Sequence, residues 1–142
     1  MQKIQLVKIV KVEREKAFKA GTDFESFASK LPQYFKLIRI RSIREHTSVV
    51  EIHGKIAGKE FAVMTKNVIN PPEIHETFVL SGDARGSHIT KRYEPVQDGT
   101  RITIDIDLKL RGFLRLVSIF SVNKIKKIIN EYFDDFVKAI ET

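Results

Sequence analysis

The C-terminal segment, residues 111–142, restricts the fold more than any other part of the sequence. From Ile125 onward its apolar residues recur every three or four positions, which is the spacing of one face of an α-helix. The residues on this face are Ile125, Ile128, Ile129, Tyr132, Phe133, Phe136, Val137 and Ile140. Polar and charged residues fill the opposite side. This half of the segment therefore predicts a helix that lies on a hydrophobic core.

The first half of the same segment has no polar side. If it is helical, its apolar residues point in every direction around the axis: Phe113, Leu114, Leu116, Val117, Ile119, Phe120 and Val122. A helix of this kind needs apolar partners on several sides. Surrounding protein, an apolar ligand cavity or a membrane surface could each supply them. The interruptions at Arg115, Ser118 and Lys124 argue against a membrane-spanning helix.

Most of the remaining sequence predicts strands joined by short turns. Residues 3–13 alternate between apolar and polar, as a first strand does. A helix is expected over residues 24–31, with Thr22 or Asp23 as its N-cap, and another short turn of helix at 33–35 after Pro32. From residue 36 to 110 the pattern is nearly all strand, with turns expected at 45–48, 57–59, 70–72, 82–86 and 97–99.

The last predicted strand, TRITIDIDLKL, alternates most regularly, with Ile102, Ile104 and Ile106 on one face. Short connections imply antiparallel hairpins. A curved antiparallel sheet with one apolar face must cover that face, and the C-terminal helix is the only element long enough. The expected architecture is α+β, one domain over residues 1–142.

This layout resembles the START/polyketide cyclase-like (SRPBCC) superfamily, with the coenzyme Q-binding and polyketide cyclase-like branches nearest. The local matches are VEREKAF followed by TDFESFASKLPQYFKLIRI, the NPPE turn, and YEPVQDGTRITI. The resemblance implies a helix-grip fold, in which a seven-stranded curved antiparallel sheet wraps around a long C-terminal helix and two short helices separate the first two strands. It also implies an apolar cavity between sheet and helix. Members of the superfamily bind lipids, sterols, quinones, polyketides or plant hormones, and some are cyclases or hydroxylase components.

Hairpin geometry predicts which side chains line that cavity, because residues opposite each other on antiparallel strands share a face. Centring each turn on its Gly, Pro or Asn residues pairs Val63 with Ile52, Thr65 with Phe78, Asn67 with Glu76, Glu76 with Tyr93, and Lys91 with Ile104. With the first half of the C-terminal segment as its gate, the predicted ligand-binding set is Ile52, Phe61, Val63, Thr65, Asn67, Glu76, Phe78, Lys91, Tyr93, Ile104, Ile106, Phe113, Leu116, Val117 and Phe120.

The polar members of this set, Thr65, Asn67, Glu76, Lys91 and Tyr93, interrupt an otherwise apolar face. Such a mixture suits a pocket that orients a hydrophobic ligand by its polar group. Alternatively, Glu76 and Lys91 pair in water near the sheet edge and orient nothing. The leading hypothesis is binding of a lipid, isoprenoid quinone or polyketide-like compound. The second hypothesis is a cyclase or hydratase in the same cavity, with Glu76 or Tyr93 as acid–base group and the two side chains within hydrogen-bond reach of each other.

Metal and nucleophilic chemistry find little support. The chain has no cysteine, and its four histidines form no HxH or HExxH pair. The predicted register puts His53, His75 and His88 on the outer face of the sheet and His46 in a turn. We therefore expect neither a metal site nor a cofactor.

The net charge of +7 leaves two kinds of partner to consider besides a small molecule. Arg111, Lys124, Lys126 and Lys127 flank the apolar segment, as in a protein that contacts an anionic membrane transiently. The basic residues Arg39, Arg41 and Arg44 lack the interleaved exposed aromatics that stack on bases, which argues against nucleic acid. A Lys-rich solvated surface accounts for the charge better than a dedicated anion-binding site does. The sequence predicts a cytoplasmic protein and leaves its oligomeric state open.

Overall fold

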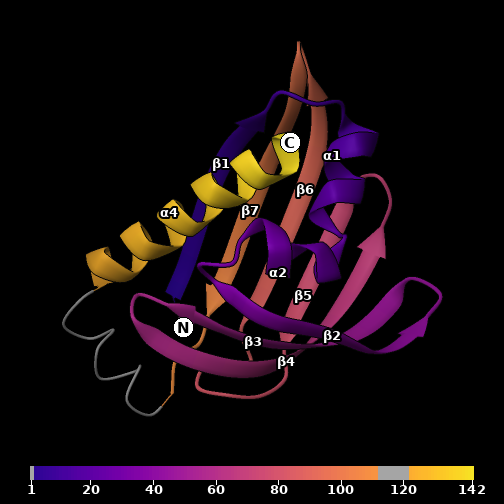
Figure 1. The fold of residues 1–142 in the computed structure, drawn as a ribbon. Coiled ribbons are helices and arrows are strands. Elements are labelled where there is room, and N and C mark those ends of the chain that lie inside the picture. Colours follow the sequence, from indigo (N-terminus) through magenta and orange to yellow (C-terminus); the bar gives the residue numbers. More distant parts are fainter. Residues whose placement is uncertain (1, 112–121) are drawn as a thin grey trace.

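A computed structural model of the chain describes residues 2–111 and 122–142. Its elements, in chain order, are β1 (Gln2–Val10), α1 (Arg14–Gly21), the short 3-10 helix η1 (Phe24–Ser26), α2 (Phe27–Lys30), β2 (Phe35–Arg44), β3 (Thr47–Ile56), β4 (Lys59–Asn70), β5 (Ile74–Val79), β6 (His88–Val96), β7 (Gly99–Leu108) and α4 (Val122–Glu141). Figure 1 shows this arrangement.

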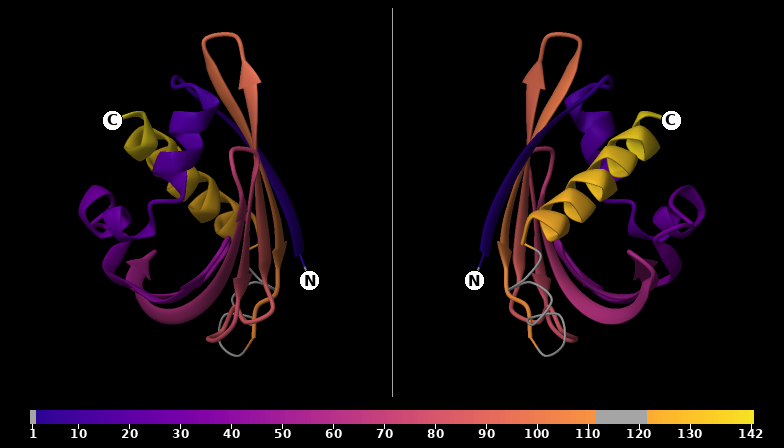
Figure 2. Two further views of the ribbon diagram at one scale, coloured as in Figure 1. Left: turned by 90° about the vertical axis from the view of Figure 1, so that its right-hand side faces the viewer. Right: turned by 90° about the vertical axis from the view of Figure 1, so that its left-hand side faces the viewer.

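The strands form one seven-stranded antiparallel sheet in the order β1-β7-β6-β5-β4-β3-β2. The sheet is strongly curved, and the helices α1, η1, α2 and α4 lie on its concave side (Figure 2). Helix α4 crosses that side and contacts β1, while α1 and α2 cover other parts of it (Figures 1 and 2). The predicted α+β architecture, a curved antiparallel sheet around a long C-terminal helix, is confirmed.

The core lies between the concave face and the helices, and the sequence patterns place residues in it as expected. In β7, Ile102, Ile104 and Ile106 are buried, whereas Arg101 and Asp105, which point to the other face, are exposed. In α4, Phe133 and Phe136 are three residues apart, so they share one face of the helix, and both are buried. Burial of these apolar side chains is the main force that holds the helix on the sheet.

A polar contact fixes the outer side of α4 against the edge strand. The Lys8 ammonium of β1 donates hydrogen bonds to Asn130 Oδ1 at 2.6 Å and to Asp134 Oδ1 at 2.7 Å. Because the Asp134 side chain is half-exposed, this ion pair orients the helix more than it stabilises it.

The helices between the first two strands differ from the prediction. The expected helix over 24–31 is present as η1 followed by α2, but residues 33–34 form a turn and β2 already begins at Phe35. The helix α1 was not predicted, because only Ala17, Phe18 and Gly21 of its eight residues are buried and its surface is highly charged. So few core contacts leave almost no periodic signal.

Candidate functional site

The side chains of strand β5 lie on the opposite faces of the sheet from those that the sequence predicted. Thr65 pairs with Val79, and Asn67 with Thr77, each one residue away from the predicted partner. The cause is the turn between β4 and β5, whose three residues 71–73 shift the register by one. The register between β5 and β6 also differs from the prediction by an odd number of residues. His75 pairs with Lys91, so Glu76 lies opposite Thr90 and not opposite Tyr93. The two errors cancel at β6, so β5 alone turns its side chains to the opposite face.

Glu76 and Phe78 consequently lie on the convex face, and their predicted places on the cavity wall are wrong. The Phe78 ring stacks on His88, with ring centroids 4.4 Å apart. Glu76 Oε1 lies 3.5 Å from His88 Nε2. Glu76 and Phe78 therefore contact His88 on the surface and not the interior of the fold. The predicted outward positions of His53 and His88 agree with the structure, whereas that of His75 is wrong.

The inversion brings His75 and Thr77 to the concave face, where they join Thr65, Asn67 and Lys91. We call these five residues the inner polar cluster. Asn67 is its centre: its Oδ1 lies 2.8 Å from both His75 Nε2 and Thr77 Oγ1, and its Nδ2 lies 3.0 Å from Thr65 Oγ1. Thr65, Asn67 and His75 are each at most 4% exposed. The cluster is therefore a hydrogen-bonded network inside the fold.

One backbone carbonyl sets the direction of the hydrogen bonds that run from Val50 through Thr65 and Asn67 to His75. Thr65 Oγ1 donates its single proton to the carbonyl oxygen of Val50, at 3.3 Å. It must therefore accept from Asn67, which places the Asn67 amide nitrogen toward Thr65 and the oxygen toward His75. His75 in turn donates from Nε2. In the neutral ring its Nδ1 is then an acceptor, and this atom is buried without a hydrogen-bond partner among the described residues.

His75 is held in that neutral form. Burial lowers the pKa of its imidazole well below the ordinary value of 6.5, and the charge of Lys91 lowers it further. The Phe24 ring of η1 flanks the imidazole, with centroids 5.4 Å apart. At neutral pH the cluster therefore presents an uncharged histidine with one free lone pair.

Lys91 is the second unusual group. It is 9% exposed, and its ammonium lies over the α4 rings of Phe136 and Phe133, 4.7 and 5.6 Å from their centroids. Within residues 2–111 and 122–142, no carboxylate forms an ion pair with it, and the predicted alternative of a Glu76–Lys91 pair is wrong. Burial alone lowers its pKa from 10.5 to about 8. A lysine this deep normally has an acidic partner.

Tyr93 lies on the predicted concave face but not near Glu76. It packs under α1, where the Phe18 ring meets it edge to face at 5.0 Å and Gly21 contacts its hydroxyl end. Its hydroxyl is buried without a partner among the described residues, and burial raises its pKa. The predicted Glu76–Tyr93 acid–base pair is therefore wrong, because the two side chains lie on opposite faces of the sheet.

Solved structures with the same architecture identify the fold. TTHA0849 from Thermus thermophilus superposes with a TM-score of 0.84 at 13% identity, covering 99% of this chain and 94% of that one. A START superfamily protein from Mycobacterium smegmatis has a TM-score of 0.78 at 19% identity, covering 98% and 94%. The Zhui aromatase/cyclase from Streptomyces sp. R1128 has a TM-score of 0.74 at 10% identity, covering 99% and 91%. No protein-family model matches the sequence, and no curated protein is significantly similar to it.

The chain has the START/polyketide cyclase-like helix-grip fold. The other sheet residues predicted to line the cavity lie on the same face as the inner polar cluster, because side chains alternate between the two faces along each strand. Ile104 and Ile106 are buried, and Ile52, Phe61 and Val63 are half-buried. The predicted gate residues Phe113, Leu116, Val117 and Phe120 lie outside the described residues. A ligand-binding role for all of these positions stays a prediction.

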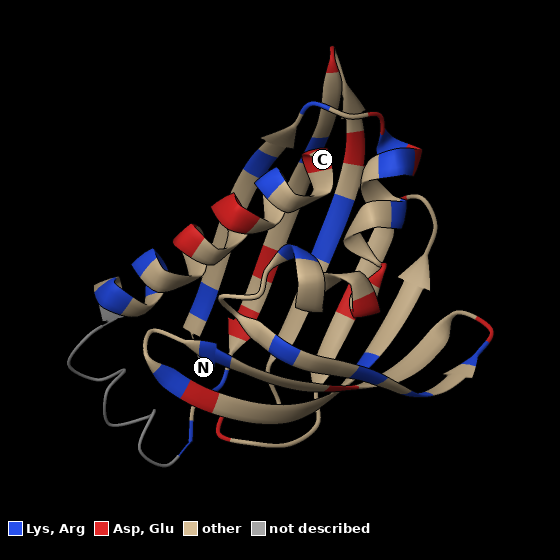
Figure 3. Cartoon of the chain, in the orientation of Figure 1, with Lys and Arg blue, Asp and Glu red and all other residues tan. Residues whose placement is uncertain are grey.

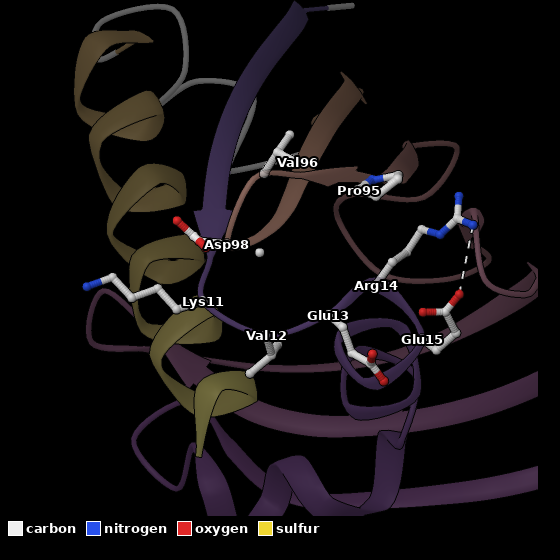
Figure 4. Close-up of a pocket in the computed structure, with 9 residues that line it drawn as sticks. Lys11, Val12, Glu13, Arg14, Glu15, Pro95, Val96 and Asp98 are labelled. Atoms are coloured by element: carbon white, nitrogen blue, oxygen red, sulfur yellow. Dashed lines mark ion pairs between the residues drawn. The ribbon is translucent and has the colours of Figure 1, made fainter.

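Two hollows of the helix-grip domain surface lie away from the inner polar cluster. The larger, of about 390 Å³, lies where the β1–α1 connection meets the β6–β7 hairpin (Figure 4). Its lining mixes both charges, and the side chains of Lys11 and Arg14 extend away from each other. The second, of about 380 Å³, lies beside His53 and Phe61. Neither lining includes a residue of the inner polar cluster, and in the second hollow the Lys36 ammonium is already paired with Glu60 at 2.6 Å, so neither replaces the inner polar cluster as the candidate site.

The predicted membrane contact stays a prediction. Lys124, Lys126 and Lys127 in the first turns of α4 are exposed, as is Arg111, and acidic residues are found only farther along the helix (Figure 3). None of the helices in the described part of the chain is both long and apolar enough to cross a membrane.

Proposed function

We propose that this protein binds an apolar small molecule that carries a polar oxygen group, in the space between the concave face of the sheet and α4. The observation that carries the proposal is the His75 Nδ1 lone pair, which is buried on that face without a partner among the described residues, next to the Lys91 ammonium, with which no described carboxylate forms an ion pair. The helix-grip fold supports it, since this architecture is shared with a START superfamily protein and with an aromatase/cyclase.

The energetics explain why unmatched groups point to a ligand. A buried polar atom that loses its water and gains no partner costs about 1–3 kcal/mol, and a buried charge costs more. His75 and Lys91 are cross-strand partners, so both costs fall at one place on the sheet. A ligand oxygen bound there would recover both interactions. Apolar and aromatic side chains around them, including Phe24, Phe133 and Phe136, would hold the rest of the molecule.

Binding is favoured over catalysis by the positions of the two candidate acid–base residues. The enzyme hypothesis needs Glu76 and Tyr93 to face each other inside the cavity, and Glu76 lies on the convex face instead. Tyr93, with its raised pKa, stays protonated at neutral pH and contacts Phe18 and Gly21 of α1. Glu76 and Tyr93 therefore cannot act together as an acid–base pair, and the role proposed for the inner polar cluster is to orient a ligand.

The first experiment is binding of 1-anilinonaphthalene-8-sulfonate, an aromatic anion that fluoresces in apolar sites. We expect saturable binding that Lys91→Met weakens about tenfold or more, because a hydrogen bond to a charged group is lost. Lys66→Met is the matched control. It makes the same substitution at an exposed position of β4 on the opposite face of the sheet, and it should leave binding unchanged. Organic extraction of the purified protein and mass spectrometry should also recover an apolar compound. Absence of saturable binding together with an empty extract would refute the proposal.

A further inference from the structure

The hydrogen-bonding pattern of the inner polar cluster restricts the ligand to one chemical class. This inference rests on the proposed function and names the group that the site recognises. We infer that the site binds an acidic hydroxyl, that of a phenol or an enol, whose proton is donated to His75 Nδ1 and whose oxygen accepts from Lys91 Nζ.

The acceptor half of this site is dictated by its neighbours. The Val50 carbonyl can only accept, so the chain of hydrogen bonds through Thr65 and Asn67 runs in one direction and ends on the Nε2 proton of His75. The ring cannot exchange its donor and acceptor nitrogens without breaking that chain. Nδ1 therefore offers a lone pair, and it is buried with no described partner. A ligand atom at this position has to be a donor.

The donor half is Lys91, whose ammonium has protons to give and no lone pair. It is the cross-strand partner of His75, and its charge acts on the His75 imidazole. Its present contacts are the ring faces of Phe133 and Phe136, and no carboxylate of the described residues pairs with it. A ligand atom near this ammonium has to be an acceptor.

Few functional groups meet both demands. A carboxylate or a ketone only accepts, so it would satisfy Lys91 but place its lone pairs against that of His75. An ammonium only donates, and it would meet a like charge at Lys91. A hydroxyl does both through a single oxygen. An acidic hydroxyl does so best, because its proton is the stronger donor and the developing negative charge on its oxygen strengthens the bond from Lys91.

The surroundings favour a flat hydroxylated molecule. Phe24 flanks His75, and the rings of Phe133 and Phe136 lie beside Lys91. Aromatic faces pack well against other aromatic or conjugated ring systems. Phenols and conjugated enols combine that shape with the acidic hydroxyl, whereas a simple fatty alcohol provides neither.

Three naphthalenes of nearly equal size test this inference by calorimetry: 2-naphthol, 2-methoxynaphthalene and 2-naphthoate. We expect 2-naphthol to bind about tenfold or more tightly than the methyl ether, which cannot donate, and more tightly than the carboxylate. His75→Phe should remove the preference for the hydroxyl while the methyl ether still binds. Glu76→Gln, in the same strand but on the convex face, is the control and should retain the preference.

Nitrogen NMR of the unmodified protein gives a second reading that does not depend on a variant folding. The His75 Nδ1 resonance should be that of an unprotonated nitrogen, and it should shift toward the hydrogen-bonded value with 2-naphthol but not with the methyl ether. Equal affinities for all three compounds, tightest binding of the carboxylate, or a protonated Nδ1 would overturn the inference while leaving the binding function intact. Failure of all three to bind would also overturn the inference, whereas the binding function itself is refuted only by the absence of saturable 1-anilinonaphthalene-8-sulfonate binding together with an empty extract.

Discussion

Replacing Lys91 with methionine should stabilise the folded protein by about 3 kcal/mol at neutral pH. Folding lowers the pKa of this lysine from 10.5 to about 8, and each tenfold change in proton affinity corresponds to about 1.4 kcal/mol. Methionine fills similar volume and has no charge to bury. The contact of the ammonium with Phe136 offsets part of the burial cost in the native protein.

The pH dependence of this effect has a defined sign. Below pH 8, Lys91 is protonated in both the folded and the unfolded chain, so the native protein bears the full cost. Between pH 8 and 10.5 the unfolded chain binds more protons, and the stability of the native protein rises with pH. The advantage of Lys91→Met should therefore be largest below pH 8 and shrink steadily toward pH 10.5.

Urea unfolding of both proteins at intervals from pH 7 to 10 measures the difference. Burial also raises the pKa of Tyr34, to about 12, and those of Tyr93 and Tyr132, which lowers stability in strongly basic solution. These groups are present in both proteins, so the difference between the two isolates Lys91. Lys66→Met should show no such trend. A Lys91→Met protein that is less stable than the native one at pH 7, or a difference that is constant with pH, would contradict the assignment.

Replacing Gly21 with alanine should destabilise the protein by about 2 kcal/mol, because α1 approaches the sheet too closely for a side chain at this position. A Cβ on Gly21 would overlap the Tyr93 hydroxyl and lie 3.4 Å from Phe136 Cζ. Tyr93 is 1% exposed, and its ring is held by Phe18, so it cannot move aside cheaply.

A double-mutant cycle with Tyr93→Phe tests the cause. Removing the hydroxyl leaves Tyr93 Cζ, 3.3 Å from the added Cβ, as the nearest atom, so the cost of Gly21→Ala should fall below about 1 kcal/mol. Tyr93→Phe alone should be neutral or slightly stabilising, because the lost hydroxyl has no described partner. Gly58→Ala is the control, since its cost arises from a φ of +80° in open space and should not depend on residue 93. Equal costs of Gly21→Ala in both backgrounds would exclude the clash.

The two effects expected for Lys91→Met run in opposite directions, toward higher stability and weaker binding. Such opposition is typical of a residue that serves a site rather than the fold. Tyr93→Phe should instead leave binding unchanged, because the Tyr93 hydroxyl contacts α1 and not the inner polar cluster. Together, these variants separate the groups proposed to hold a ligand from those that only pack.

Much of the fold could be predicted because its signals are local. The alternation of Ile102, Ile104 and Ile106 marks the inner face of β7, and the periodicity that includes Phe133 and Phe136 marks the buried side of α4. Turn residues showed where most of the strands end. In each case, the residues that carry the pattern are near one another in the sequence, and their burial requires only that some core exists.

The candidate site could not be predicted as well, because it depends on how strands pair. Thr65, Asn67 and Lys91 were placed on the correct face, but Glu76 was placed where His75 and Thr77 lie. The sequence shows a turn at Pro71-Pro72 without showing how many residues it contains, and one residue more inverts the strand that follows.

The sequence by itself determined the architecture of this protein, since amphipathic periodicity and turn residues are properties of short segments. Only the tertiary structure decided which side chains meet inside it. The contact of Tyr93 with Gly21 and the pairing of His75 with Lys91 join residues from different elements. The free lone pair of His75 likewise depends on a hydrogen-bond chain that begins at Val50. Contacts of this kind follow from strand register and helix docking, which are set by packing across the whole domain.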